Sequence, residues 1–423
     1  MSIYKNSIEV ARLFNSIEIG VNKILIICGG FQQLPAVILA KNMGMEVLVV
    51  DKNPNCVCKR YADKFKVINA KDYKKIIDYS IENKVDLAFT MQSDLPVRAM
   101  CEVNNIIKEN SKQLDATIRC CNKAKTRKTL TETICPQPVY RVLNKKPKIV
   151  DISILWERIG KNEKAILKPV DSSGSRGVTI IEKPEQIQSA YLKAVEHSYS
   201  GVVIMEEFID GVEFGAQTMS IGGKCVSIHI HSDYMNPLGI VPVGHSYPGE
   251  IKGIKRPEAE VIIKEAINSL GIINGPTNVD CIIDKNGKVF IIEVGARIGS
   301  VCLPELTSYY TGYDWINLSL AALSGRIENF TPPKIKKNHC SGIILQSNKT
   351  GLLDNVWTDK KLKESDECIL SEIHAKKGDA VRLLNNGTDN IGRVIFGGLS
   401  NFKKYEKKCQ DFQKKLCITL LND

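Results

Sequence analysis

The sequence predicts a mixed α/β and α+β protein. A doubly wound parallel sheet comes first, an α+β unit rich in antiparallel strands follows, and a small mixed α+β unit ends the chain. A β-α-β pattern with continuous apolar strands occupies residues 21–118, as in parallel sheets. Short strands and an Asn-Gly hairpin signal mark residues 119–330. Further short strands and one charged helix fill residues 331–423, and the 423 residues suit about three structural units.

The first elements support the parallel-sheet prediction. Residues 1–20 have the apolar spacing of an amphipathic helix that would dock on the first domain. An apolar strand at Lys23–Ile27 ends in a Gly-Gly turn, and a helix over Leu34–Met43 leads to a second strand, Glu46–Asp51. The turn lacks the GxGxxG spacing, so a dinucleotide site is not favoured. The domain continues with a helix and a strand, Tyr73–Asn83 and Leu87–Thr90.

The second unit starts with a basic helix at Asn122–Glu132, after which the sequence is rich in strands. The predicted strands are Ala165–Lys168, Val178–Ile181, Val202–Met205, Val279–Ile283 and Val289–Glu293. The last two flank the turn Lys285–Lys288, whose Asn-Gly pair is a strong hairpin signal.

The third unit follows the linker Pro332-Pro333. Its predicted elements are three strands and a charged helix, Cys340–Gln346, Ala380–Leu384, Gly392–Phe396 and residues 400–417.

Composition narrows the function classes. The formal charge is +11, but the lysines are scattered and no basic stretch contains interleaved aromatics, so we expect no nucleic-acid partner. The 14 cysteines show neither zinc-type pairing nor a disulfide rhythm, which indicates a reducing compartment. No apolar run approaches the roughly 20 residues of a membrane span. We therefore expect a cytoplasmic protein without a membrane partner.

The first segment whose residues suggest a binding site is a lysine followed by a loop of small residues. Lys168 ends a predicted strand, and the loop at residues 172–177 contains two glycines, two serines besides Ser172, and Arg176. Small residues let backbone N–H groups approach phosphate oxygens, and the lysine adds a charge. The loop is not a Walker loop, because no GK[ST] precedes a helix. A flexible glycine hairpin is the alternative.

Two further segments carry acids. A buried strand runs into Glu206 and Glu207, and Glu213 follows a glycine turn; taken alone, these are solvated acids at a strand end. Asp280 and Glu293 lie on the two strands of the predicted hairpin, which brings their carboxylates together as a Mg²⁺ site would require. Arg297 could hold a phosphoryl group, and a salt bridge between Glu293 and Arg297 is the alternative.

The three segments occur in this order within one unit, so residues 119–330 resemble an ATP-grasp domain. Residues 21–118 resemble the domain that precedes it in that superfamily. The resemblance implies a cytoplasmic ATP-dependent, ADP-forming carboxylate–amine ligase that works through an acyl phosphate. ATP and Mg²⁺ are the implied cofactors, with Mn²⁺ as an alternative ion, and a homodimer is suggested. The partners are small molecules, a carboxylate and an amine.

The resemblance also implies residue roles. Lys123 and Lys168 hold the nucleotide phosphates, with Arg127 as a second choice for the first, and Lys168 has a catalytic part. A mobile lid spans about 135–205, and its phosphate loop consists of Ser172, Ser173, Gly174, Ser175, Arg176 and Gly177. The adenine hinge consists of Glu206, Phe208 and Ile209, and Glu213 contacts the ribose. Asp280 and Glu293 are the magnesium ligands, and Arg297 is the catalytic arginine that steadies the acyl phosphate and contacts substrate.

One position departs from the superfamily pattern, because Gly295 stands where many members have a metal-binding asparagine. Residues 377–398 resemble the terminal domain of L-amino-acid ligases, which suggests an amino acid as one substrate. Two alternatives stay open. The first is a bicarbonate-using carboxylase that resembles carboxyaminoimidazole ribonucleotide synthetase, and the second is a non-catalytic nucleotide-binding regulator.

Three histidines lie between the hinge and the hairpin, at His229, His231 and His245, with Asp233 and Tyr234 nearby. His229 and His231 point the same way on a strand. We predict that the histidines line the substrate pocket. A metal pair and plain surface positions are the alternatives, since the sequence alone identifies no third ligand.

Overall fold

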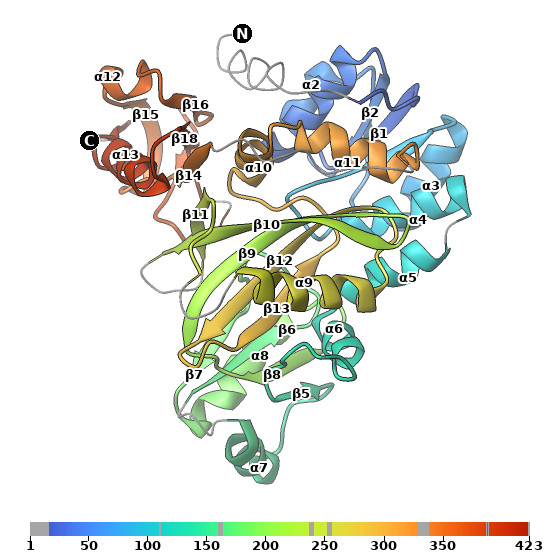
Figure 1. The fold of residues 1–423 in the computed structure, drawn as a ribbon, viewed down its shortest axis with the longest axis vertical. Coiled ribbons are helices and arrows are strands. Elements are labelled where there is room, and N and C mark those ends of the chain that lie inside the picture. Colours follow the sequence, from blue (N-terminus) through green and yellow to red (C-terminus); the bar gives the residue numbers. More distant parts are fainter. Residues whose placement is uncertain are drawn as a thin grey trace.

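The computed structural model describes residues 17–109, 111–159, 164–236, 241–251, 256–327, 338–385, 387 and 389–421 (Figure 1). Most of the helix predicted at residues 1–20, and the linker Pro332-Pro333, lie outside the described residues. The predicted fold class is confirmed, with a parallel sheet at the N-terminal end and antiparallel sheets after it. No helix in the described part of the chain combines the length and apolar character needed to cross a membrane.

The N-terminal sheet is parallel and has the order β3-β2-β1-β4. Its strands are β1 (Lys23–Ile27), β2 (Glu46–Asp51), β3 (Lys64–Val67) and β4 (Leu87–Phe89). Successive side chains of a strand point to opposite faces. Ile24 and Ile26 of β1 therefore enter one core, whereas Leu25 and Ile27 enter another. Helices on both faces make the sheet doubly wound.

The two faces of this sheet are covered by helices from different parts of the chain. One face packs against α2 (Leu34–Asn42) and α11 (Trp315–Ser324), and the other against α3 (Tyr73–Glu82), α4 (Val97–Lys108) and α5 (Ser111–Cys120). Figure 1 shows α11, in orange, beside the blue strands β1 and β2. The N-terminal sheet is thus completed by a helix that follows it by more than 200 residues in sequence.

A small antiparallel sheet has the order β5-β8-β6-β7. Its strands are β5 (Tyr140–Leu143), β6 (Ala165–Pro169), β7 (Thr179–Ile181) and β8 (Val203–Glu207). The helices α7 (Ile149–Ile159) and α8 (Ile187–His197) contribute to its core, and α6 (Lys123–Leu130) precedes it. Except for the last two residues of β8, this sheet falls within the predicted lid at 135–205. The mobility of that region stays a prediction.

The large sheet has eight strands in the order β13-β12-β9-β10-β11-β14-β18-β16. They are β9 (Gly211–Ile221), β10 (Lys224–Met235), β11 (Pro242–Tyr247), β12 (Gly275–Asp284), β13 (Val289–Gly295), β14 (His339–Leu345), β16 (Cys368–Ile373) and β18 (Gly392–Gly398). Residues of α9 (Arg256–Leu270) join the core with β9, β10, β12 and β13, and α10 (Leu303–Thr311) packs on β11 and β14.

The C-terminal segment extends the large sheet instead of folding apart from it, because β14, β16 and β18 pair in series with β11. A small sheet of β15 (Gly351–Trp357), β17 (Ala380–Val381) and β19 (Cys417–Leu420) lies beside them, with α12 (Lys360–Lys363) and α13 (Phe402–Lys414). The boundary predicted at residue 330 therefore divides two regions that share one sheet.

Candidate active site

Two carboxylates meet on one face of the large sheet, in the β12–β13 hairpin. Asp280 and Glu293 are directly paired across the two strands, as the hairpin signal predicts. Asn278 donates a hydrogen bond to Asp280 Oδ1 at 2.7 Å. Burial, and next the charge of Glu293, raise the pKa of Asp280 to about 8. Two oxygen donors that repel each other in this way fit a divalent cation such as Mg²⁺, which would relieve the repulsion.

Lys123 contacts this acid pair from the first residue of α6, which Asn122 caps by accepting a hydrogen bond from the Lys125 N–H. Its Nζ lies 2.9 Å from Glu293 Oε1 and donates to the Ser172 carbonyl at 2.8 Å. Burial by itself lowers the pKa of Lys123, but the carboxylates of Glu293, Asp94 and Glu206 together outweigh it and the net direction is upward. The ammonium is therefore charged where the phosphate loop begins.

Lys168 forms a second buried charged group with Glu206 and Arg127. The Glu206 carboxylate lies 2.8 Å from both Lys168 Nζ and Arg127 Nε. Burial raises the pKa of Glu206, but Arg127 and then Lys168 lower it to about 2. Lys168 also interacts electrostatically with Lys123. The two lysines predicted to hold phosphates thus belong to one cluster of charges, next to the paired acids.

The side chain of Arg127 is buried among other partners, whereas its predicted contact with phosphate would require free donors that face the phosphate loop. Its side chain is 0% exposed. Besides Glu206, it donates to the carbonyl oxygens of Ile291 and Ile292, each at 2.9 Å. It therefore joins the small sheet to β13, where Glu293 lies, and this geometry makes it a positioning residue. Glu206 likewise directs its carboxylate to the two cations, so an adenine contact would depend on the backbone near Phe208 and Ile209.

The phosphate loop lies between β6 and β7, with Ser172 buried at its start. Gly177 has φ +75°, and a Cβ there would lie 2.9 Å from His197 Cβ, so a side chain is excluded at this position. Arg176 Nε donates to the Ser173 carbonyl at 3.0 Å within the same loop. Gly174 and Ser175 also have positive φ, +66° and +59°. The glycines and small residues of this loop thus allow a tight turn in which the backbone N–H groups lie close together.

Arg297 pairs with Asp94, which sequence reasoning missed. Its Nη2 lies 2.8 Å from Asp94 Oδ2, whereas Glu293 pairs with Lys123, so the predicted alternative of a Glu293–Arg297 salt bridge is wrong. Arg297 Nε is buried without a hydrogen-bond partner in the structure. Asp94 follows β4 at the carboxyl edge of the parallel sheet, where ligands bind in open α/β folds, and that position was the available signal.

Two cavities adjoin these residues. One, of about 160 Å³, lies where three regions meet and is lined by Phe31, Asp94, Ser173, Arg297, His374 and Arg393, among others. The other, of about 400 Å³, is lined by Tyr73, Asp94, Asp171, Ser172, Lys123 and Glu293, among others. Asp94 lines both cavities, and its partner Arg297 lines the smaller one.

Glu213 and the histidines lie on the same sheet face as Asp280. Gly215 pairs with Asp280 on one side and with His231 on the other, and Glu213 precedes Gly215 by two residues. Burial, and next Asp233, raise the pKa of Glu213 to about 7, whereas Lys168 lowers it. Its predicted ribose contact stays a prediction.

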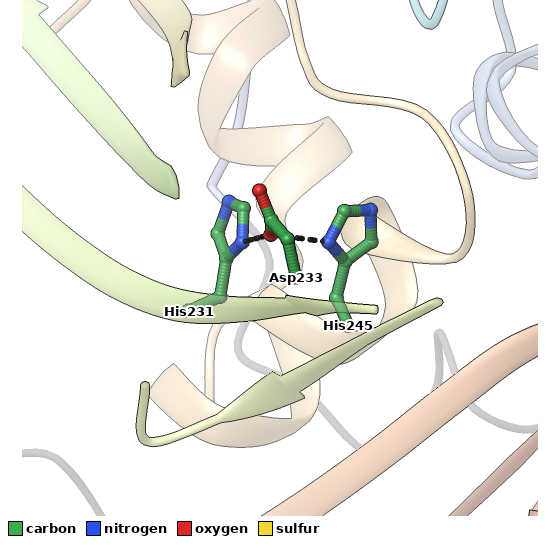
Figure 2. Close-up of side chains that lie close together, drawn as sticks. All are labelled: His231, Asp233 and His245. Carbon is green, nitrogen blue, oxygen red and sulfur yellow. Dashed lines mark hydrogen bonds and ion pairs between the residues drawn. The ribbon is translucent and has the colours of Figure 1, made fainter. Parts of the chain in front are cut away.

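All three histidines are buried, so the alternative of surface positions is wrong. The ring of His229 lies edge-on to Trp315 at 5.4 Å, and burial lowers its pKa to about 4. His231 and His245 both contact Asp233 (Figure 2). The three histidines are not among the residues that line the two cavities described above, and a role in lining the substrate pocket stays a prediction.

Comparisons with known proteins find a matching family and several relatives. Residues 120–301 match the family described as ATP-grasp domain. The phosphoribosylamine–glycine ligase of Thermococcus kodakarensis is 24% identical over 238 residues, 54% of this chain and 50% of that protein. The 3-methyl-D-ornithine–L-lysine ligase of Methanosarcina mazei is 24% identical over 320 residues, 72% and 73% of the two chains. The crystal structure of L-amino acid ligase from Bacillus licheniformis has a TM-score of 0.76 at 19% identity, covering 95% of this chain and 99% of that one.

These likenesses differ in what they establish. The family match covers the elements that carry the paired acids, both lysines and Arg297. At 19% identity, the likeness to the solved structure establishes the fold alone. The chain spans about half the length of several curated relatives.

Proposed function

Because the chain contains an ATP-grasp domain, we propose that it is an ATP-dependent, ADP-forming carboxylate–amine ligase with an amino acid as one substrate. One observation carries the proposal: the acids Asp280 and Glu293 are paired beside Lys123, whose charge in turn acts on Lys168. Two lysine ammonium groups next to two carboxylates that can bind a divalent metal suit a nucleoside triphosphate with its bound metal ion. Relatives named as ligases of glycine and of L-lysine support the substrate class.

The residue roles follow from this placement. Lys123, Lys168 and the backbone of residues 172–177 would hold the phosphates, with adenine beside Phe208 and Ile209 and ribose beside Glu213. Asp280 and Glu293 would hold Mg²⁺, or Mn²⁺ in its place, and a bound ion neutralises charge on the phosphates. Gly295 does not supply the usual further ligand, and a Cβ at that position would lie 3.0 Å from Asp94 Oδ1.

The proposed reaction has two steps. A substrate carboxylate oxygen attacks the γ-phosphorus of ATP, and ADP leaves with the electrons of the broken bond. The amine nitrogen then attacks the acyl carbon, the phosphate leaves, and the nitrogen loses a proton. Arg297 suits the negative charge that develops on the acyl oxygen, because Asp94 fixes one end of its guanidinium and Nε has no other partner. The 160 Å³ cavity beside Arg297 is the proposed substrate pocket.

The test is phosphate release from ATP and Mg²⁺ in the presence of pairs of amino acids. Lys168→Met and Glu293→Gln should abolish release, while the exposed Lys128→Ala and Glu258→Gln should leave it unchanged. Circular dichroism checks that each variant is folded. Turnover that survives in both site variants contradicts the site assignment.

The same assay separates the two alternatives. ADP release that depends on bicarbonate and needs no amino acid would indicate the carboxylase. Tight ATP binding without phosphate release from any substrate pair would indicate the regulator.

A further inference from the structure

A second group of metal-type ligands lies on the same face of the large sheet as the Asp280–Glu293 pair. Asp233 of β10 is directly opposite His245 of β11, and His231 precedes Asp233 by two residues, so all three side chains project to one face. His231 Nδ1 lies 2.7 Å and His245 Nδ1 2.8 Å from Asp233 Oδ1. Figure 2 shows the two rings on either side of the carboxylate.

The three donor atoms lie close together. One ligand atom from each residue lies within 4.8 Å of the others. Both imidazoles approach the same oxygen of Asp233, although a carboxylate that served only as a hydrogen-bond acceptor could offer one oxygen to each ring. Two ring nitrogens and one carboxylate oxygen at this spacing form a ligand set that suits a single cation.

The charge balance of the group also favours a cation. All three side chains are at most 9% exposed. Among the described residues, the only ion-pair partners within 4 Å of Asp233 are the two histidines. Burial disfavours the charged form of an imidazole, so a buried ring is a poor source of positive charge. A buried carboxylate in such surroundings needs a positive partner.

We propose that His231, Asp233 and His245 bind a divalent transition-metal ion, separately from the magnesium site proposed at Asp280 and Glu293. Two imidazole nitrogens and one carboxylate oxygen suit Zn²⁺ and related borderline ions. Mg²⁺ prefers oxygen ligands and does not fit this set. The structure supplies in Asp233 the third ligand that the sequence alone did not identify. The proposal does not depend on the ligase function.

The position of His231 is also restricted by two neighbouring glycines. His231 lies over Gly215, where a side chain would collide with the ring carbon Cε1 and lie 2.8 Å from Nε2. The absence of a side chain at this position leaves room for the imidazole to turn toward Asp233. The backbone of Gly249 packs against the backbone of His231 from another segment, so the position of the residue is fixed as well.

The test uses metal-free full-length protein, prepared with a chelator, and needs neither ATP nor Mg²⁺. Co²⁺ is added while its visible absorption spectrum is recorded, and Zn²⁺ affinity is measured by competition with a coloured chelator. We expect one equivalent of tight binding, with a spectrum typical of nitrogen and oxygen ligands and without the charge-transfer band of thiolates. The absence of the thiolate band distinguishes binding at this site from binding to cysteines.

Variants locate the binding. His231→Gln and His245→Gln should each weaken Zn²⁺ by roughly 100-fold or more, because even groups that only hydrogen-bond to metal ligands contribute roughly 10–100-fold. Asp233→Asn can still accept hydrogen bonds from neutral imidazoles but lacks the negative charge, so it should keep its fold and lose the metal. His197→Gln, on α8, is the matched control.

Three outcomes overturn the proposal. They are the absence of tight binding in the wild-type protein, a thiolate-type Co²⁺ spectrum, and unchanged affinity in folded Asp233→Asn. If the histidine variants fail to fold, the wild-type spectrum and Asp233→Asn still decide. Asp280→Asn and Glu293→Gln should retain the transition metal while losing phosphate release, which separates a failure of this proposal from a failure of the ligase proposal.

Discussion

The strongest stability prediction concerns Arg127, the buried residue between the small and the large sheet. Arg127→Met removes the two-pronged pair with Glu206, whose nitrogen–oxygen distances are 2.8 and 3.2 Å, and leaves the carbonyls of Ile291 and Ile292 without this donor. Breaking a buried ion pair on one side typically costs about 3–5 kcal/mol. We therefore expect the free energy of unfolding to fall by about that amount.

A second route gives a similar magnitude. The pKa of Glu206 falls from 4.5 to about 2 in the folded protein, first through Arg127 and then through Lys168, against the opposing effect of burial. One pKa unit corresponds to about 1.4 kcal/mol, so the ionised Glu206 carboxylate contributes about 3 kcal/mol to stability as the net result of both cations and burial. Because the pKa is depressed, this contribution is complete above about pH 4.5 and disappears as the pH falls toward 2.

Urea unfolding measured between pH 3 and pH 7 tests both statements. The wild-type protein should lose stability below about pH 4.5, and Arg127→Met should be less stable at neutral pH and lose less on acidification, since one of the two partners of Glu206 is gone. Arg141→Met, an exposed arginine on β5, is the matched control and should change stability by less than about 0.5 kcal/mol. Equal effects of the two substitutions, or identical pH dependence in Arg127→Met and wild type, would refute the reasoning.

Two other substitutions test the site. Arg297→Lys keeps a charge near Asp94 but loses the guanidinium fork and its unpartnered Nε, so phosphate release should fall by about 100-fold or more; an unchanged rate excludes Arg297 from catalysis. Gly215→Ala places a methyl group against the His231 ring, so it should destabilise the protein by about 1–3 kcal/mol in urea unfolding and weaken Co²⁺ binding. Wild-type Co²⁺ affinity in that variant would contradict the placement of the ring.

Local sequence patterns predicted much of the fold. The strand at Glu46–Asp51 has the predicted bounds, and the helix over Leu34–Asn42 ends one residue earlier than predicted. The proximity of Asp280 and Glu293 was also predictable, because an Asn-Gly turn joins their two strands in a hairpin. Their direct pairing depends in addition on a register shift between Asp280 and Cys281. These features share a cause: the residues that specify them are neighbours along the chain.

Contacts between distant segments were not predictable in this way. Lys123 and Glu293 are 170 residues apart in sequence, and Arg297 and Asp94 are 203 apart. Arg127 was the second choice, after Lys123, for a phosphate contact, and it donates to Glu206 and two backbone carbonyls. Which partner a buried charge finds depends on how the sheets pack, and no local pattern records that packing.

The sequence by itself thus determined the class of each unit, the hairpin that carries two acids, and the loop of small residues after Lys168. Only the tertiary structure decided that Asp233 stands between two histidines, that helix α11 completes the N-terminal sheet, and that the C-terminal strands continue the large sheet. The physical reason is that strand order and helix docking arise from burying apolar faces that lie far apart in the chain. Side chains on those elements meet only after the faces have packed.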